Sequence, residues 1–154
     1  MNRRSLIVAA FACGFFAFAA QPASANVKKA LEHAHKAAAE YLKKGFSLRE
    51  DNWKGKMSVG KKKAIKHQLY KGNEYWFWLG TSTPDVKLTV RVYDSKGRPV
   101  DVETKSDKKS AAARVLAPKT GTYYIVIHAT PAKPKDKKKF KKDAVEWALV
   151  YGYR

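Results

Sequence analysis

Lysine side chains gather in two segments of the sequence. One segment holds Lys61, Lys62, Lys63 and Lys66. The other runs from Pro131 to Lys142 and has seven lysines against one aspartate, a local charge of +6; its lysines are Lys133, Lys135, Lys137, Lys138, Lys139, Lys141 and Lys142. The chain of 154 residues has 32 Lys and Arg against 13 Asp and Glu, a formal net charge of +19. This excess predicts electrostatic binding of an anionic partner. A surface that is merely solvated is the alternative.

The type of basic residue narrows the class of partner. Lysine is a compact, mobile point charge, whereas arginine reads phosphates and base edges with a rigid fork of donors. The lysine-rich segments therefore favour diffuse attachment to an anionic polymer, a lipid surface or an acidic protein. They disfavour sequence-specific recognition of nucleic acid.

Two tryptophans form a second group of residues that could bind a ligand. The segment from Glu74 to Gly80 alternates so that Tyr75, Phe77 and Leu79 would face a core, which sends Trp76 and Trp78 to the opposite side of one strand. Neighbouring indoles can stack against sugar rings, which predicts a carbohydrate-binding module as the alternative function. The other hypothesis is that an N-terminal helix covers the two indoles, because an exposed pair of this size is a large apolar surface.

No pattern of catalytic residues stands out. His33 and His35 lie two residues apart on an expected helix and point in nearly opposite directions, while His67 and His128 are expected at outward or strand-end positions. There is no nucleophile elbow and no phosphate-binding glycine loop. We therefore predict no enzyme, no cofactor and no metal site. An unrecognised hydrolase using a carboxylate pair, or a calcium site at Asp85 or Asp94, is a less favoured alternative.

The first 25 residues have the pattern of a secretory signal peptide. Arg3 and Arg4 precede an apolar stretch from Leu6 to Ala20, and Ala23-Ser24-Ala25 forms a small-x-small cleavage signature. The apolar stretch is short for a membrane span, which needs about 17–25 residues. Lipid attachment at Cys13 would cut through the apolar region. The sequence thus predicts export to the periplasm or medium, with a chain that lacks cysteine after residue 25.

The remaining chain divides into a helix and a region of strands. Helical spacing of apolar residues predicts a helix over 26–45, with Asn26 as N-cap and Gly45 as the residue that ends it. The period changes to two from about Trp53, and 53–154 is expected to form the β domain. Its expected strands cover 64–70, 74–80, 86–93, 98–103, 112–116, 122–129 and 144–153. The lysine run 131–142 holds two prolines, which favours an extended connection.

The stretch from about Met57 to Tyr153 resembles the bacterial pre-peptidase C-terminal domain. The matching features are a strand opening with Gly72, Tyr75 and Phe77, a strand ending in Val90-Arg91-Val92-Tyr93-Asp94 with Gly97, the segment Pro118-Lys119-Thr120-Gly121-Thr122-Tyr123, and Trp147 with Leu149 in the last strand. The resemblance covers about two-thirds of the chain and rests on turn and core residues. It implies a jelly-roll-like β-sandwich that accompanies secreted enzymes as a non-catalytic module, here expected to stand alone.

The motif residues have simple structural roles. Asp94 can accept hydrogen bonds from the turn that Gly97 closes, Gly121 is placed where a turn favours positive φ, and the Tyr123 hydroxyl can reach a backbone carbonyl. Together these patterns predict a mainly all-β protein, an antiparallel jelly-roll-like β-sandwich with one N-terminal α-helix. We expect it to act as an exported, non-catalytic binding protein with a basic surface.

Overall fold

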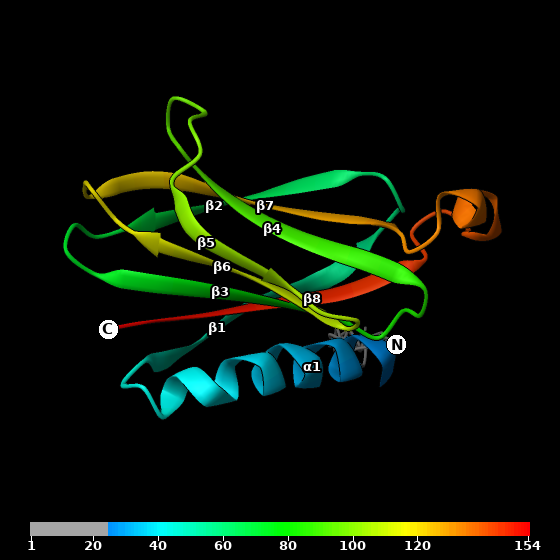
Figure 1. The fold of residues 1–154 in the computed structure, drawn as a ribbon, viewed down its shortest axis with the longest axis horizontal. Coiled ribbons are helices and arrows are strands. Elements are labelled where there is room, and N and C mark those ends of the chain that lie inside the picture. The colour runs from blue at the N-terminus through cyan, green and yellow to red at the C-terminus, as the bar shows by residue number, and fades with distance from the viewer. Residues whose placement is uncertain (1–24) are drawn as a thin grey trace, which may run out of the picture.

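The computed structural model describes residues 25–154 and contains one α-helix, eight strands and one 3₁₀ helix. The predicted signal peptide, apart from Ala25, lies outside the described residues. The elements are α1 (Ala25–Leu42), β1 (Ser47–Met57), β2 (Lys62–Leu69), β3 (Glu74–Thr81), β4 (Val86–Asp94), β5 (Asp101–Ser106), β6 (Ser110–Leu116), β7 (Gly121–Pro131), η1 (Pro134–Lys139) and β8 (Val145–Tyr153). Figure 1 shows three layers, with α1 under one sheet and the second sheet above it.

Both sheets are antiparallel throughout. The larger sheet, here called sheet A, has the order β1-β8-β3-β6-β5, and the smaller, sheet B, has the order β2-β7-β4. The predicted all-β sandwich with one N-terminal helix is therefore confirmed. A division into five and three strands does not confirm the finer jelly-roll assignment.

The sandwich core lies between the inner faces of the two sheets. Alternate side chains of β3 and β8 face it, as the period of two predicted, and they meet those of β4 and β7. The largest fully buried members of this core are Trp147, Phe77, Leu69, Leu79, Leu88, Ile125, Ile127, Leu149, Val90, Val92 and Val115. Every residue of β8 except Tyr153 is buried, because this strand is covered on both faces.

The outer face of sheet A carries a second apolar cluster, which α1 covers. Ala34, Ala38 and Tyr41 of α1 pack with Trp76, Trp78, Val150 and Ala112. The buried positions of the helix recur three and four residues apart, and this spacing places them on one face. Phe46, directly after the helix, completes the cluster.

The C-terminus of α1 is set by glycine, as predicted. Gly45 has a φ of +88°, which L-residues with side chains rarely adopt. Its N–H donates to the Leu42 carbonyl at 3.2 Å, and the Phe46 N–H donates to the Tyr41 carbonyl at 3.2 Å. The expectation for the other end was wrong, since Asn26 lies inside the first turn and the helix includes Ala25.

Two predicted turn features are confirmed and a third is not. The carboxylate of Asp94 accepts hydrogen bonds from the N–H groups of Lys96 and Arg98, both at 2.9 Å. The Tyr123 hydroxyl donates to the Lys119 carbonyl at 2.7 Å. Gly121, in contrast, is not among the glycines with positive φ, because it already belongs to the extended backbone of β7.

Two segments differ from the sequence prediction. The β domain was expected from about Trp53, with no strand before residue 64, but β1 already begins at Ser47. It gave no alternating pattern because this edge strand is polar on both faces over most of its length. The strand also contains an irregularity between Leu48 and Asn52. The lysine run was expected to be extended, but Pro134–Lys139 forms a 3₁₀ helix with a proline in its first turn.

Gly80 controls how closely α1 approaches sheet A. A methyl group at this position would lie 2.2 Å from the Ala30 carbonyl oxygen and 2.5 Å from the Ala34 nitrogen. The substitution Gly80→Ala should therefore displace the helix and lower the free energy of unfolding by about 3 kcal/mol. Equilibrium denaturation with urea measures this loss.

The matched control is Gly121→Ala, where the added methyl group meets no atom within 4 Å. It should leave the urea midpoint nearly unchanged. Equal stability of the Gly80 and Gly121 variants would contradict the close approach of α1 to β3.

Candidate anion-binding site

The structure brings the two predicted lysine segments to one end of the sandwich. The turn between β1 and β2 lies against the connection between β7 and β8 (Figure 1). Ser58 and Asp143 join the two, since the Ser58 hydroxyl donates to Oδ1 of Asp143 at 3.1 Å and the Asp143 N–H donates to the Ser58 oxygen at 3.0 Å. The Gly60 N–H also donates to the Ala129 carbonyl at 2.8 Å. These bonds hold residues that are distant in sequence side by side.

We call this surface the lysine end. It consists of Lys61, Lys62, Lys63, Lys133, Lys135, Lys137, Lys138, Lys139, Lys141 and Lys142. All are exposed. Lys66 is exposed as well, but it lies further along β2, opposite Tyr124 in β7. Of the eleven lysines predicted from the sequence, the structure thus places ten at one end of the sandwich and leaves Lys66 apart. The ten lie on the turn before β2, on the first two residues of β2 and on the connection between β7 and β8.

Few carboxylates compensate these charges. Among the described residues, only Lys139 of the lysine end forms a salt bridge, to Asp136 at 2.8 Å. The hydrogen bond from Lys139 to that carboxylate raises the pKa of Lys139. The other ammonium groups have no carboxylate within 4.0 Å in the described part of the chain, so they are available to an external anion.

The connection that carries most of these lysines is anchored to the body of the protein. Phe140, which lies between Lys139 and Lys141 in the sequence, packs against the sandwich core. The Ala132 N–H donates to the Asp85 carbonyl at 2.7 Å, which ties the start of the connection to the loop before β4. The lysine side chains therefore extend from a backbone with fixed points.

The tryptophan pair is not a surface platform. Trp76 is 2% exposed and Trp78 is fully buried. The Tyr41 ring lies over both, with centroid distances of 4.5 Å to Trp76 and 5.4 Å to Trp78. The hypothesis of an outward glycan-stacking pair is wrong for this structure, because α1 covers the face that carries the indoles. The opposing prediction, a helix lying across them, is confirmed.

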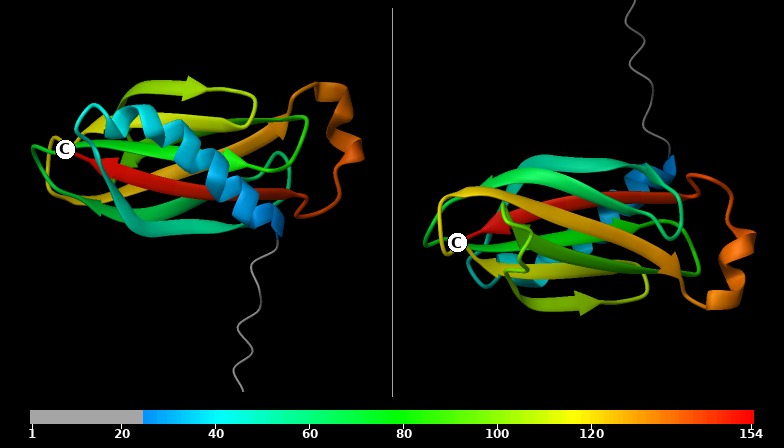
Figure 2. Two further views of the ribbon diagram at one scale, coloured as in Figure 1. Left: turned by 90° about the horizontal axis from the view of Figure 1, so that it is seen from below. Right: turned by 90° about the horizontal axis from the view of Figure 1, so that it is seen from above.

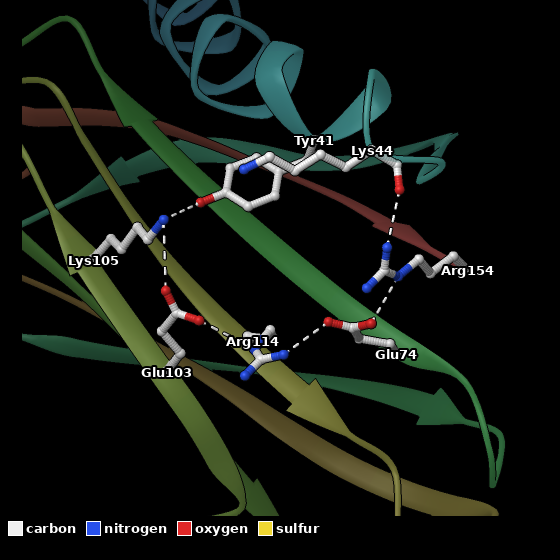
Figure 3. A network of polar contacts seen from close by, with 7 residues as sticks. All are labelled: Tyr41, Lys44, Glu74, Glu103, Lys105, Arg114 and Arg154. Atoms are coloured by element: carbon white, nitrogen blue, oxygen red, sulfur yellow. Dashed lines mark hydrogen bonds and ion pairs between the residues drawn. The ribbon is translucent and has the colours of Figure 1, made fainter.

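A chain of polar contacts starts at Tyr41 of this aromatic cluster and runs across the neighbouring strands (Figure 3). The ammonium of Lys105 donates to the Tyr41 hydroxyl at 2.6 Å and lies 3.5 Å from Glu103. Arg114 then links Glu103 to Glu74, at 3.2 and 3.0 Å. These bonds join the last turn of α1 to β5, β6 and β3.

The chain closes through the C-terminal residue of the sequence. Arg154 pairs with Glu74 at 2.7 Å and donates to the Lys44 carbonyl at 3.0 Å, just after the helix. Burial acts to raise the pKa of the Glu74 carboxyl, but hydrogen bonds from Arg114 and Arg154 outweigh it, and the pKa is lowered. We call this chain of contacts the belt. It holds α1 at Tyr41 and the segment after the helix at Lys44, close to Phe46.

The histidines and acidic residues do not converge. His67 was expected to point outward, but it is half-buried between Trp53 and Tyr151, with ring centroids at 5.1 and 4.6 Å, and burial lowers its pKa. Asp85 directly precedes β4 and Asp94 is its last residue. Because a strand of this length is extended, the two carboxylates are about 30 Å apart. Residues 25–154 contain no group of three His, Cys, Asp or Glu side chains that could hold a metal ion.

Comparison with known proteins adds no family. No model of a known protein family matches the chain, and no curated protein matches it significantly in sequence. The resemblance to the pre-peptidase C-terminal domain therefore stays a prediction. Within the part that the structure describes, no helix has both the length and the apolar character needed to cross a membrane.

Tyr41 is the main cover of the tryptophan pair, and it is 4% exposed. The substitution Tyr41→Ala should lower the free energy of unfolding by about 3–5 kcal/mol, since it leaves a cavity over two indoles. It should also increase quenching of tryptophan fluorescence by iodide. The control is Tyr70→Ala, which removes a ring that is 55% exposed. Equal quenching in both variants would show that α1 does not shield the pair.

The lowered pKa of Glu74 predicts a pH dependence of stability. Its carboxylate stabilises the fold fully above about pH 5, and this contribution is lost as the pH falls through the folded-state pKa, which lies below the ordinary value of 4.5. At pH 7 the variant Glu74→Gln should be less stable by about 1–2 kcal/mol.

Denaturation at several pH values measures the difference, which should shrink as the solution is acidified. Glu50→Gln is the control, because Glu50 is exposed and its side chain has no salt bridge among the described residues. A difference between wild type and Glu74→Gln that stays constant down to pH 3 would contradict the stabilisation of the ionised carboxylate.

Proposed function

We propose that this protein is an exported, non-catalytic binding protein that attaches to an anionic polymer through its lysine end. The observation that carries the proposal is the concentration of ten exposed lysines at one end of the sandwich, with only one in a salt bridge among the described residues. A positive surface of this kind attracts polyanions by Coulomb forces and by release of their bound counterions. Acidic glycans and lipopolysaccharide are such polymers in the envelope and outside the cell.

The chemistry of the lysine end favours a partner with repeated charge. Lysine ammonium groups on long stems adapt to irregularly spaced anions and make no fixed bidentate contact. The side chain of Lys137 passes beside Gly60, where a methyl group would lie 3.8 Å from its Cε, so lysines from both connections share one surface. A chain of negative groups could contact both connections at once, which a single small anion could not.

The sandwich suits the role of a rigid support. The described histidines lie on α1, β2 and β7 without forming a shared site, and the strongest carboxylate contacts of Glu74 go to arginines of the belt around α1. These groups serve stability. The export predicted from residues 1–25 would bring the lysine end to extracellular or envelope polymers, and an anionic lipid surface or an acidic protein would be bound by the same forces.

A charge-matched pair of variants tests the proposal. In the first, Lys61, Lys62, Lys137 and Lys138 are all changed to Gln. In the control, four exposed lysines in the connections at the other end of the molecule, Lys43, Lys71, Lys96 and Lys119, are changed to Gln. Both variants lose the same net charge. Binding to immobilised heparin and to anionic and neutral vesicles is then measured over a range of salt concentrations.

The lysine-end variant should bind heparin about ten-fold more weakly, and the slope of log affinity against log salt should fall by about 3. The control should remain close to wild type. Equal weakening of both variants would reduce the effect to net charge, and no weakening of either would show that the lysine end is only a solvated surface. Preference for anionic vesicles over heparin would assign the partner to lipid.

A further inference from the structure

The outer face of sheet B has no helix over it. α1 packs on β3 and β8 of the other sheet, and η1 lies beyond the end of β7. Figure 2, right, looks onto β2, β7 and β4 from this side, with no described helix lying across them. Side chains alternate along each strand, so half of those on sheet B point away from the core and toward solvent. This face is therefore open to another molecule.

The strand register places two tyrosines side by side at the centre of this face. Tyr124 of β7 is paired with Tyr93 of β4 on one side and with Lys66 of β2 on the other. Residues opposite each other in antiparallel strands have Cβ atoms about 4.5–5.5 Å apart. Tyr124 is 36% exposed, and Tyr93 is partly exposed. Neither ring packs against another aromatic ring among residues 25–154, so both are accessible from solvent.

The neighbouring rows of the face continue the same arrangement. Val126, two residues beyond Tyr124 in β7, is paired with Arg91 of β4. His128, two residues further, is paired with Lys62 of β2. Successive rows on one face of a strand are about 7 Å apart. The central strand thus presents a strip of partly exposed aromatic and apolar side chains, and the outer strands carry cations beside it.

Few carboxylates compensate the cations of this face. β2, β4 and β7 contain one acidic residue between them, Asp94, which is the last residue of β4. Lys66 and Lys87 are exposed, and neither has a carboxylate within 4.0 Å in the part of the chain that the structure describes. Arg91 pairs through its Nε with Asp101 at 2.9 Å, and its side chain remains 48% exposed. The face therefore combines a positive potential with a flat aromatic centre.

We infer that the outer face of sheet B binds single-stranded nucleic acid without reading its sequence. Unpaired bases stack on Tyr93 and Tyr124, and the phosphates lie beside Lys66 and Lys87. Stacking on aromatic side chains along a basic track is how proteins bind single strands of any sequence, since every base has a flat face. This face shares only Lys62 with the lysine end, and the inference does not depend on the proposed function.

Other polymers match the face less well. The bases of a duplex are stacked inside it, so a duplex could offer Tyr93 and Tyr124 only its backbone. A neutral oligosaccharide has many hydroxyl groups to pair, and the rows around Val126 have no carboxylate or amide side chain to accept them. A polyanion without flat rings would use the cations but would gain nothing from the tyrosines.

A pair of ligands with equal charge tests the inference. One is a fluorescein-labelled ten-residue strand of thymidylate, and the other is an abasic deoxyribose phosphate strand of the same length. Binding is measured by fluorescence anisotropy in the variant in which Lys61, Lys62, Lys137 and Lys138 are changed to Gln, so that attachment to the lysine end is suppressed. The thymidylate strand should bind about ten-fold more tightly than the abasic strand, because only it has bases to stack.

Two double variants of the tyrosines, made in the same background, locate the stacking site. Tyr93→Ala with Tyr124→Ala should lower the affinity for the thymidylate strand to that for the abasic strand, and binding of the abasic strand should be unchanged. The matched control is Tyr93→Phe with Tyr124→Phe, which keeps both rings and should bind within about two-fold of its parent. Circular dichroism and thermal unfolding establish that each variant is folded.

A second pair of variants locates the phosphates. Lys66→Gln with Lys87→Gln should weaken binding of both strands about five-fold, since both lose contacts to phosphate. Lys28→Gln with Lys43→Gln removes the same charge from exposed positions on α1 and just after it. This control should change either affinity by less than about two-fold.

Three results would overturn the inference. The first is equal affinity for the thymidylate and abasic strands, which would leave only an attraction between charges. The second is a preference for thymidylate that survives the double alanine variant, which would place stacking elsewhere. The third is tighter binding of a ten-base-pair duplex than of the single strand. With stacking established, comparison of thymidylate with uridylate assigns the partner to DNA or to RNA by the tighter binding.

Discussion

The burial of the outer face of sheet A beneath α1 is the contact on which the rest of the structure depends. β3 and β8 carry apolar side chains on both faces, so a two-layer sandwich would leave Trp76, Trp78 and Val150 in water. An indole has roughly 150–250 Å² of surface to bury, which makes exposure of two neighbouring rings costly. The alanines of α1 allow the helix to lie close to Gly80, and Tyr41 fills the remaining space over the rings. The belt from Lys105 to Arg154 then fixes the C-terminal end of α1, where Tyr41 covers the two indoles.

This arrangement separates the surfaces of the molecule by role. The covered face of sheet A is stabilised by aromatic contacts and ion pairs, and the carboxylates of Glu74 and Glu103 are engaged there by arginines. The lysine end has few such partners. Its positive charge is therefore left largely uncompensated within the described residues.

Much of the fold could be predicted from the sequence, for reasons that are local. β3, β4, β7 and β8 have strong alternation and clear turns, and Gly45 marks the helix end. The side of β3 that carries Trp76 and Trp78 followed from the same alternation. β1 was missed as a strand because its stability comes from pairing with β8 and not from an apolar pattern of its own. The 3₁₀ helix η1 was missed because proline is compatible both with the first turn of a helix and with an extended backbone.

The candidate sites were less predictable, because they depend on contacts between distant segments. The eleven lysines could be found by composition, but their meeting at one end depends on β2 pairing with β7. Composition alone also could not separate Lys66 from the others.

Native-state hydrogen exchange of the backbone amides tests most directly whether α1 is an integral layer of this fold. Exchange is measured for Ala34 and Ala38 of α1 and for Phe77 and Leu79 of β3, across increasing denaturant. If the helix and sheet A form one cooperative unit, all four amides should exchange with the same free energy, equal to that of global unfolding. Exchange of the α1 amides at a free energy at least 2 kcal/mol lower, on the order of a local opening, would show that the tryptophan face can be uncovered while the sandwich stays folded, and would contradict the account.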